Sequence, residues 1–235
     1  MHDKLTRPYP ANYDLHARSV AINAYWQQVK RTVYGQPLDE AQIALIVDNI
    51  VAGLDLRSDD VVLDLACGNG ALSSRLFGRC RGLVGVDMSP YLVEIAQRDF
   101  ARPPHYRFCV SDAVSYLALQ HDVPAFTKVL IYCAFPYFSR ADGARVLRML
   151  GDGFATVTRV FIGELPNRRR ADRFYRERIP VETTLDDHEA QIGVWYLPEE
   201  IAALARAAGW LFSCSDMPCD FQAAAYRFNA TLVRP

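Results

Sequence analysis

Residues 61–70 constrain the fold of this chain more than any other part of it. Positions 61–67 form an apolar run with β-branched residues, interrupted by one carboxylate, Asp64, which is typical of a strand buried in a parallel sheet. Gly68 and Gly70 follow, then an amphipathic segment over 71–77. Glycines permit a sharp turn and close approach of bare backbone to a ligand, and the next helix presents its N–H groups there. The segment therefore predicts an α/β sheet that binds a nucleotide-like molecule at the carboxyl end of its first strand.

Strand and helix patterns alternate along the rest of the chain. Strand patterns occupy about 61–67, 83–87, 106–110, 129–133 and 159–165, and two more lie near 211–215 and 226–233 with no helix between them. Helices are expected over about 39–54, from position 90, over 140–154 and over 198–209. This alternation predicts a doubly wound, mostly parallel sheet.

Composition limits the partners and the setting that we expect. The 235 residues carry a net charge of −1, so no global field favours nucleic acid or a membrane surface, and we expect neither as a partner. No apolar run reaches the ~20 residues that span a bilayer, and no signal-peptide pattern opens the chain. The six cysteines form no Cys-x-x-Cys pair and no metal-like cluster with histidine, which predicts a reduced cytoplasmic setting and no metal site.

The details of the glycine turn bear on which nucleotide binds. A dinucleotide fingerprint requires a third glycine, but Ser73 occupies that position. Asp64 stands four residues before the first glycine, where a carboxylate suits an ammonium group better than a pyrophosphate. The sequence over 64–70, Asp-Leu-Ala-Cys-Gly-Asn-Gly, resembles motif I of class I S-adenosylmethionine-dependent methyltransferases.

The resemblance covers about residues 40–235 and implies both fold and cofactor. It implies a seven-stranded Rossmann-like methyltransferase fold with an antiparallel C-terminal hairpin, over residues 38–235, and S-adenosylmethionine as cofactor. Residues 1–37 would form a helical lid, and residues 166–197 an insertion that covers the substrate. The alternative is that both segments merely shield the sheet.

Two further acids follow the second and third strands. Asp87 comes 23 residues after Asp64, where an acid can accept hydrogen bonds from ribose hydroxyls, although it could equally cap the next helix. Asp112 comes 25 residues later and could hold adenine or act as an N-cap. By resemblance, Asp64 contacts the methionine amino group. The other cofactor residues implied in this way are Ala66, Cys67, Gly68 and Gly70 around the methionyl part, Met88 at the ribose, Ala113 at adenine, Tyr132 at the sulfonium, and Trp26 and Lys30 closing over the cofactor, with Lys30 pairing with its carboxylate.

The acceptor side is less well defined. The segment 132–138 follows the fourth strand and lacks the Asn/Asp-Pro-Pro-Tyr/Phe signature of many amine and nucleic-acid methyltransferases. Its aromatic residues Phe135 and Tyr137 are candidate substrate contacts or core residues. Glu164 is the first candidate base, followed by His188 and His16. Arg168, Arg169 and Arg170 are either a solvated helix face or a clamp for an anionic acceptor.

These patterns predict methyl transfer to a small-molecule acceptor, with oxygen slightly favoured over nitrogen. We expect a secondary metabolite or a glycan-related compound that bears a phosphate, phosphonate or carboxylate. The alternatives are an NAD(P)-dependent oxidoreductase, a non-catalytic protein that retains the fold, and a transferase of aminopropyl groups. The sequence does not indicate the oligomeric state.

Overall fold

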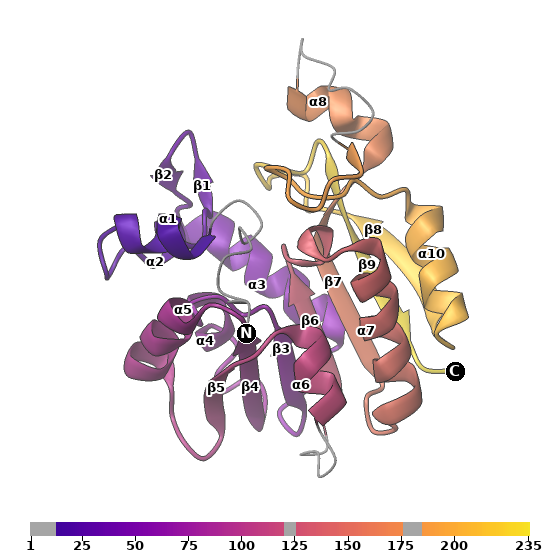
Figure 1. Cartoon of the computed structure of the whole chain (residues 1–235), viewed down its shortest axis with the longest axis horizontal. Helices are drawn as coiled ribbons and strands as arrows, with labels where there is room; N and C mark the ends of the chain where they lie inside the picture. The colour runs from indigo at the N-terminus through magenta and orange to yellow at the C-terminus, as the bar shows by residue number, and fades with distance from the viewer. Residues whose placement is uncertain (1–12, 120–125, 176–184) are drawn as a thin grey trace, which may run out of the picture.

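Seven strands form one sheet at the centre of the protein (Figure 1). The structure is a computed structural model and describes residues 13–119, 126–175 and 185–235. The strand order is β5-β4-β3-β6-β7-β9-β8. The bounds are β3 Val61–Leu65, β4 Gly82–Asp87, β5 Tyr106–Val110, β6 Lys128–Tyr132, β7 Arg159–Pro166, β8 Leu211–Asp216 and β9 Arg227–Val233. Strands β3 to β7 pair in parallel, and β9 pairs antiparallel with both β7 and β8, which confirms the predicted doubly wound, mostly parallel sheet with a C-terminal hairpin.

Helices cover both faces of the sheet and bury two apolar cores against it. One core packs α6 (Ala113–Leu119), α7 (Arg140–Gly153) and α10 (Pro198–Ala207) against the sheet. The other packs α3 (Glu40–Leu54), α4 (Ala71–Ser74), α5 (Pro90–Ile95) and the π-helical turn η3 (Ala96–Phe100). Each strand of the centre is therefore covered on both sides, which explains its continuous apolar sequence.

Local sequence signals fix where several helices begin. The side chains of Asp39, Ser89 and Ser139 accept hydrogen bonds from backbone N–H groups three residues later, at the starts of α3, α5 and α7. Pro90 follows Ser89 at the first helical position, where a missing N–H costs nothing. Because these caps are local, the sequence predicted the starts of these helices correctly.

The described part of the N-terminal segment contains α1 (Tyr13–Ser19), α2 (Tyr25–Gln28) and a small hairpin of β1 (Thr32–Val33) and β2 (Gln36–Pro37). The helical character agrees with the prediction, but the hairpin was not predicted. Two-residue strands are too short to produce a detectable alternation. Figure 1 shows this segment and α8 (Ala171–Tyr175) toward the same end of the sheet.

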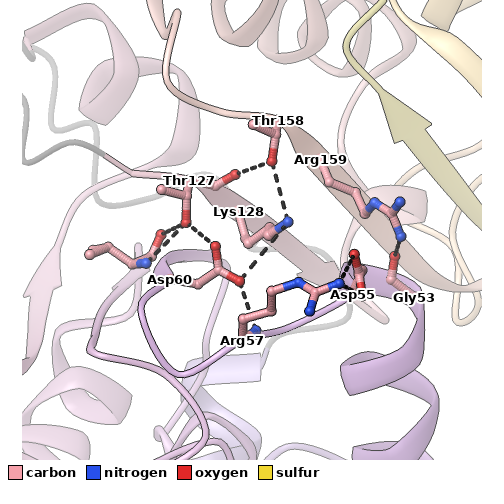
Figure 2. Close-up of polar contacts among 9 residues, drawn as sticks. Gly53, Asp55, Arg57, Asp60, Thr127, Lys128, Thr158 and Arg159 are labelled. Carbon is pink, nitrogen blue, oxygen red and sulfur yellow. Dashed lines mark hydrogen bonds and ion pairs between the residues drawn. The ribbon is translucent and has the colours of Figure 1, made fainter.

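A buried polar network joins the opposite, amino-terminal ends of β3, β6 and β7 (Figure 2). Asp60 accepts hydrogen bonds from Thr127 Oγ1 at 2.6 Å and from the Arg57 N–H at 2.8 Å. Lys128 Nζ lies 4.0 Å from Asp60 Oδ2 and donates to Thr158 Oγ1 at 3.3 Å. The network therefore lies at the end of the sheet opposite to Asp64 and Glu164, which stand near the carboxyl ends of β3 and β7.

No helix in the described ranges is long and apolar enough to cross a membrane.

Candidate functional site

A cavity of about 1770 Å³ opens at the carboxyl ends of the parallel strands. Most of the residues singled out from the sequence line it. These are Asp64, Ala66, Cys67, Gly68, Asp87, Met88, Asp112, Ala113, Tyr132, Trp26, Lys30, Tyr137, Glu164, His188 and His16. The sheet therefore brings together side chains from β3, β4, β6, β7, the loop after β5, the N-terminal segment and the 185–197 segment.

The turn after β3 combines backbone conformation with a carboxylate anchor. Ala66, Gly68 and Gly70 all have positive φ, at 63°, 59° and 75°. The Gly68 N–H donates to Asp87 Oδ2 at 2.8 Å, and the Ser89 N–H donates to Asp87 Oδ1 at 2.9 Å. Asp87 thus holds the glycine turn and the start of α5 together. A carboxylate has further acceptor positions, so these bonds leave it able to receive hydroxyl groups of a ligand.

Gly70 and Phe135 do not reach the cavity. A Cβ at Gly70 would lie 2.9 Å from Ala96 and Phe108, so this glycine permits close packing at the start of α4. Phe135 is fully buried in the core, where its ring packs against those of Phe138 and Tyr196. The expected contacts of Gly70 with the cofactor and of Phe135 with the substrate are therefore not seen in the lining of the cavity.

Asp64 is a buried carboxylate with one hydrogen-bond donor beside it. Ser73 Oγ donates to its Oδ2 at 2.6 Å, and only 3% of the residue is exposed. Burial raises the pKa of Asp64 to about 7, against the lowering effects of the Ser73 hydrogen bond and of Arg31. A cation placed next to this group would restore its ionised form.

Asp112 is exposed and caps α6. Its Oδ1 accepts a hydrogen bond from the Ser115 N–H at 2.8 Å, so the N-cap interpretation holds for one oxygen. Asp112 and Ala113 both line the cavity. The side chain can therefore cap the helix and contact a ligand at once.

The N-terminal segment is attached to the glycine turn. Asn69 Nδ2 donates to the Tyr25 carbonyl at 2.8 Å and to Gln28 Oε1 at 2.9 Å. Lys30 Nζ lies 4.7 Å from the centre of the Tyr13 ring, and burial lowers the pKa of Lys30. Lys30 and Trp26 both line the cavity.

Glu164 occupies a bulge in β7. The pairing register with β9 shifts between Ile162 and Leu165, and Glu164 has a φ of 59°. The Glu164 N–H donates to Asn229 Oδ1 at 3.1 Å. The bulge turns the carboxylate toward two guanidinium groups, with Oε1 3.5 Å from Arg31 Nη1 and Oε2 3.7 Å from Arg227 Nη1.

Aromatic and histidine side chains complete the wall next to Glu164. Tyr13 Oη donates to Tyr137 Oη at 3.4 Å, and Tyr137 Oη donates to the Gln191 carbonyl at 3.0 Å. The buried Tyr132 hydroxyl has no hydrogen-bond partner among the described residues. His188 is half-buried in the cavity lining. His16 Nε2 lies 2.8 Å from the Gln27 carbonyl oxygen and donates a hydrogen bond to it, since a carbonyl oxygen can only accept.

The three consecutive arginines lie outside the cavity. Arg168 pairs with Asp186 through two contacts of 2.9 Å, Arg169 pairs with Glu199, and Arg170 Nη1 lies 2.8 Å from Asp216 Oδ1. The structure therefore does not bring them together with the other candidate residues, and it favours the surface interpretation over the anion clamp. The downstream arginines Arg176 and Arg178 lie outside the described residues.

Sequence reasoning missed Arg31, Arg227 and Asn229. A charged residue at position 227, within an apolar strand pattern, was the one available signal. The other two depend on contacts between segments far apart in the chain, which no local pattern records.

A family model and several known proteins are similar to this chain. A family model described as a methyltransferase domain matches residues 62–152. An uncharacterized methyltransferase of Schizosaccharomyces pombe is 40% identical over 52 residues, which cover 22% of this chain and 20% of that protein. A protein of Thermococcus onnurineus, named a probable ribosomal RNA small subunit methyltransferase A, is 30% identical over 144 residues, covering 58% of this chain and 49% of that one. The chain thus spans only a fifth to a half of the length of these two relatives.

Among solved structures, magnesium protoporphyrin IX methyltransferase from Synechocystis, with bound S-adenosylmethionine, superposes with a TM-score of 0.59 at 16% identity. The match covers 95% of this chain and 97% of that one, and it supports the fold.

One prediction from the sequence is corrected by these relatives. The near-neutral charge suggested that nucleic acid is excluded as a partner, but two relatives are named as probable ribosomal RNA small subunit methyltransferases. Net charge averages over the whole surface and does not exclude a local binding face. A methyltransferase-domain model thus matches residues 62–152, and the fold of the chain is similar to that of a methyltransferase solved with bound S-adenosylmethionine.

Proposed function

We propose that the protein transfers the methyl group of S-adenosylmethionine to a small-molecule acceptor bound in the same cavity. The observation that carries the proposal is the size and division of the cavity. Pockets for one ligand commonly measure about 300–1,000 Å³, and about 1770 Å³ leaves room for a second. Acids from three successive strands line one side, and aromatic and basic side chains line the other.

In this proposal, the acidic side binds the cofactor. Asp64 contacts the methionine ammonium, Asp87 the ribose hydroxyls, and Asp112 with Ala113 the adenine. Ala66, Cys67 and Gly68 surround the methionyl part, and Met88 flanks the ribose. Tyr132 faces the sulfonium, and Trp26 and Lys30 close over the cofactor from the N-terminal segment. The contacts between Asn69, Tyr25 and Gln28 support this arrangement, because they attach that segment to the turn.

For methyl transfer, the protein mainly has to align the acceptor with the methyl group of the cofactor. The cofactor supplies an activated methyl group, and transfer is an in-line displacement for which positioning and exclusion of water provide most of the acceleration. Residues 13–37 and the described part of 166–197 line the cavity and serve as its cover in this proposal. Glu164 or His188 accepts the proton if the acceptor is a hydroxyl, the acceptor type that we favour over an amine.

The relation to ribosomal RNA methyltransferases supports a second candidate, methylation of structured RNA. The two candidates share the cofactor and differ in the acceptor.

Calorimetric titration with S-adenosylhomocysteine, with NADH in a parallel titration, tests the cofactor assignment. We expect micromolar binding of S-adenosylhomocysteine alone, and binding of NADH alone would refute the proposal. Transfer of labelled methyl from S-adenosylmethionine is then compared between a panel of small hydroxy acids and unmodified small-subunit ribosomal RNA. Label in the RNA and in no small acid would replace the first candidate by the second.

A further inference from the structure

Arg227 is a buried arginine with unused hydrogen-bonding capacity. Its side chain is 8% exposed and lines the cavity. Its contacts to described residues use Nη1, which donates to the Glu164 carbonyl at 2.6 Å and lies 3.6 Å from Cys133 Sγ and 3.7 Å from Glu164 Oε2. Nε is buried with no partner among the described residues. A buried guanidinium whose donors are not all paired is costly. Because Nε is not accessible from the cavity, Arg227 would meet a ligand through the part of its side chain that lines the cavity.

Arg31 places a second guanidinium on the other side of Glu164. Its side chain is 12% exposed, Nη1 lies 3.5 Å from Glu164 Oε1, and the group stacks over the Tyr132 ring at 5.1 Å. A single carboxylate thus faces two guanidinium groups, and neither approach is as short as a charge-assisted hydrogen bond of about 2.7–2.9 Å. This part of the cavity therefore holds a surplus of buried positive charge.

The charges that line the cavity are divided between its two sides. Asp64, Asp87 and Asp112 belong to β3, β4 and the loop after β5, on one side of the strand order. The residues of the other side come from the N-terminal segment, β7, β9 and the cover. They are Arg31, Arg173 and Arg227 against Glu164 and Glu189, and Asp142 and Arg145 of α7 cancel each other. The first side suits a cationic cofactor, and the second suits an anion.

Aromatic rings surround the basic side. Tyr13 and Tyr137 meet edge to face, with ring centroids 5.7 Å apart, and the Phe174 and Tyr226 rings are 5.1 Å apart. All four line the cavity. Such walls favour a flat apolar body, since aromatic rings pack well against another ring edge to face or with an offset.

We propose that Arg227 and Arg31 form an oxyanion site, and that the methyl acceptor is an aromatic or similarly flat compound carrying a carboxylate or phosphate group. The proposal rests on the proposed methyl transfer and names the class of its acceptor. The anion site expected at Arg168–Arg170 is thus replaced by one formed by Arg31, from the N-terminal segment, and Arg227, from β9.

The test uses benzoate and benzamide, which have nearly the same shape but differ in charge. Each is titrated into the full chain saturated with S-adenosylhomocysteine, with phenyl phosphate as a third probe. We expect benzoate or phenyl phosphate to bind at least tenfold more tightly than benzamide, and the stronger of the two identifies the anion type. Equal affinity for charged and neutral probes, or binding of none of them, would overturn the proposal.

Variants connect this preference to the arginine. Arg227→Gln is expected to remove at least tenfold of the anion affinity, Arg227→Lys to retain part of it, and both to bind S-adenosylhomocysteine as the parent does. Arg148→Gln, on the exposed face of α7, removes the same charge outside the cavity and controls for net charge. Loss of anion affinity in the control would refute the assignment. If S-adenosylhomocysteine fails to bind the parent protein, the proposed methyl transfer is refuted. If S-adenosylhomocysteine binds but the protein shows no preference for the anionic probes, only the oxyanion site is refuted.

Discussion

The buried carboxylate of Asp64 should make cofactor binding depend on pH. Its pKa is raised from 3.8 to about 7 by burial, so much of the free protein carries a neutral Asp64 below pH 7. The methionine ammonium of S-adenosylhomocysteine favours the ionised form when it binds beside this group. Binding should therefore release a proton from Asp64, and affinity should increase as the pH rises through about 7.

The magnitude follows from the fraction of protein that is already ionised. With a pKa of about 7, protonation weakens binding by about elevenfold at pH 6 and by about 1.1-fold at pH 8. The affinity for S-adenosylhomocysteine should thus rise about tenfold between these values, which corresponds to about 1.4 kcal/mol. The increase should level off above pH 8.

Calorimetry in two buffers with different ionisation enthalpies measures both the affinity and the number of protons released. Asp64→Asn is the matched control, because it keeps the size and removes the titration. The variant should bind more weakly at pH 8 and lose most of the pH dependence. An affinity of the parent protein that is flat between pH 6 and pH 8, or a variant that keeps the tenfold rise, would refute the reasoning.

The same shift has a consequence for stability. The folded protein holds the Asp64 proton more firmly than the unfolded chain does, so the free energy of unfolding falls as pH rises from about 4 to about 7. The difference between 3.8 and about 7 corresponds to about 4 kcal/mol at most. Urea denaturation at pH 8 should therefore show Asp64→Asn to be more stable than the parent, and a less stable variant would contradict the burial argument.

Three further predictions concern other parts of the molecule. Asp87→Asn replaces the charged acceptor of the Gly68 and Ser89 N–H groups by a neutral amide and leaves one of the two facing an NH2 group. Urea denaturation should therefore show a loss of ~1.5–3 kcal/mol, and unchanged stability would argue against the anchoring role. Lys128→Met removes the ammonium group next to Asp60 in the network of Figure 2 and should cost about 3 kcal/mol of stability. The affinity for S-adenosylhomocysteine should not change, because the network lies at the opposite ends of the strands, and weaker binding would show that the two ends are coupled. Replacing Arg168–Arg170 by alanine should leave labelled methyl transfer unchanged, since these side chains lie outside the cavity, and a clear drop in transfer would return them to the acceptor site.

The sheet and much of the cofactor side could be predicted because their signals are local. Each parallel strand is a short, mostly apolar run. Asp64 stands next to the last residue of β3 and Asp87 is the last residue of β4, and the alternation of strands and helices predicts that both lie at the same edge of the sheet. The caps at Asp39 and Ser89 mark helix starts within three residues.

The acceptor side could not be predicted in the same way. Arg227 meets Glu164 across an antiparallel pair with a bulge, and Arg31 reaches the same carboxylate from a segment 133 positions earlier. The run of arginines from position 168 is a conspicuous local pattern, but these arginines pair with acids that are distant in sequence, Asp186 and Asp216. Local charge patterns cannot reveal which distant acids will neutralise them.

Three non-glycine residues at the carboxyl ends of β3, β6 and β7 share a left-handed backbone: Ala66, Cys133 and Glu164 have φ values of 63°, 55° and 59°. Each such residue costs ~1–2 kcal/mol relative to a relaxed conformation. Selection for thermal stability alone would therefore favour glycine at these positions and remove the side chains at 133 and 164 from the cavity wall. Descendants of this chain that evolved in hot environments under relaxed functional constraint should lose these side chains before the apolar core changes. Retention of Cys133 and Glu164 in a heat-adapted relative would indicate continuing selection on the reaction.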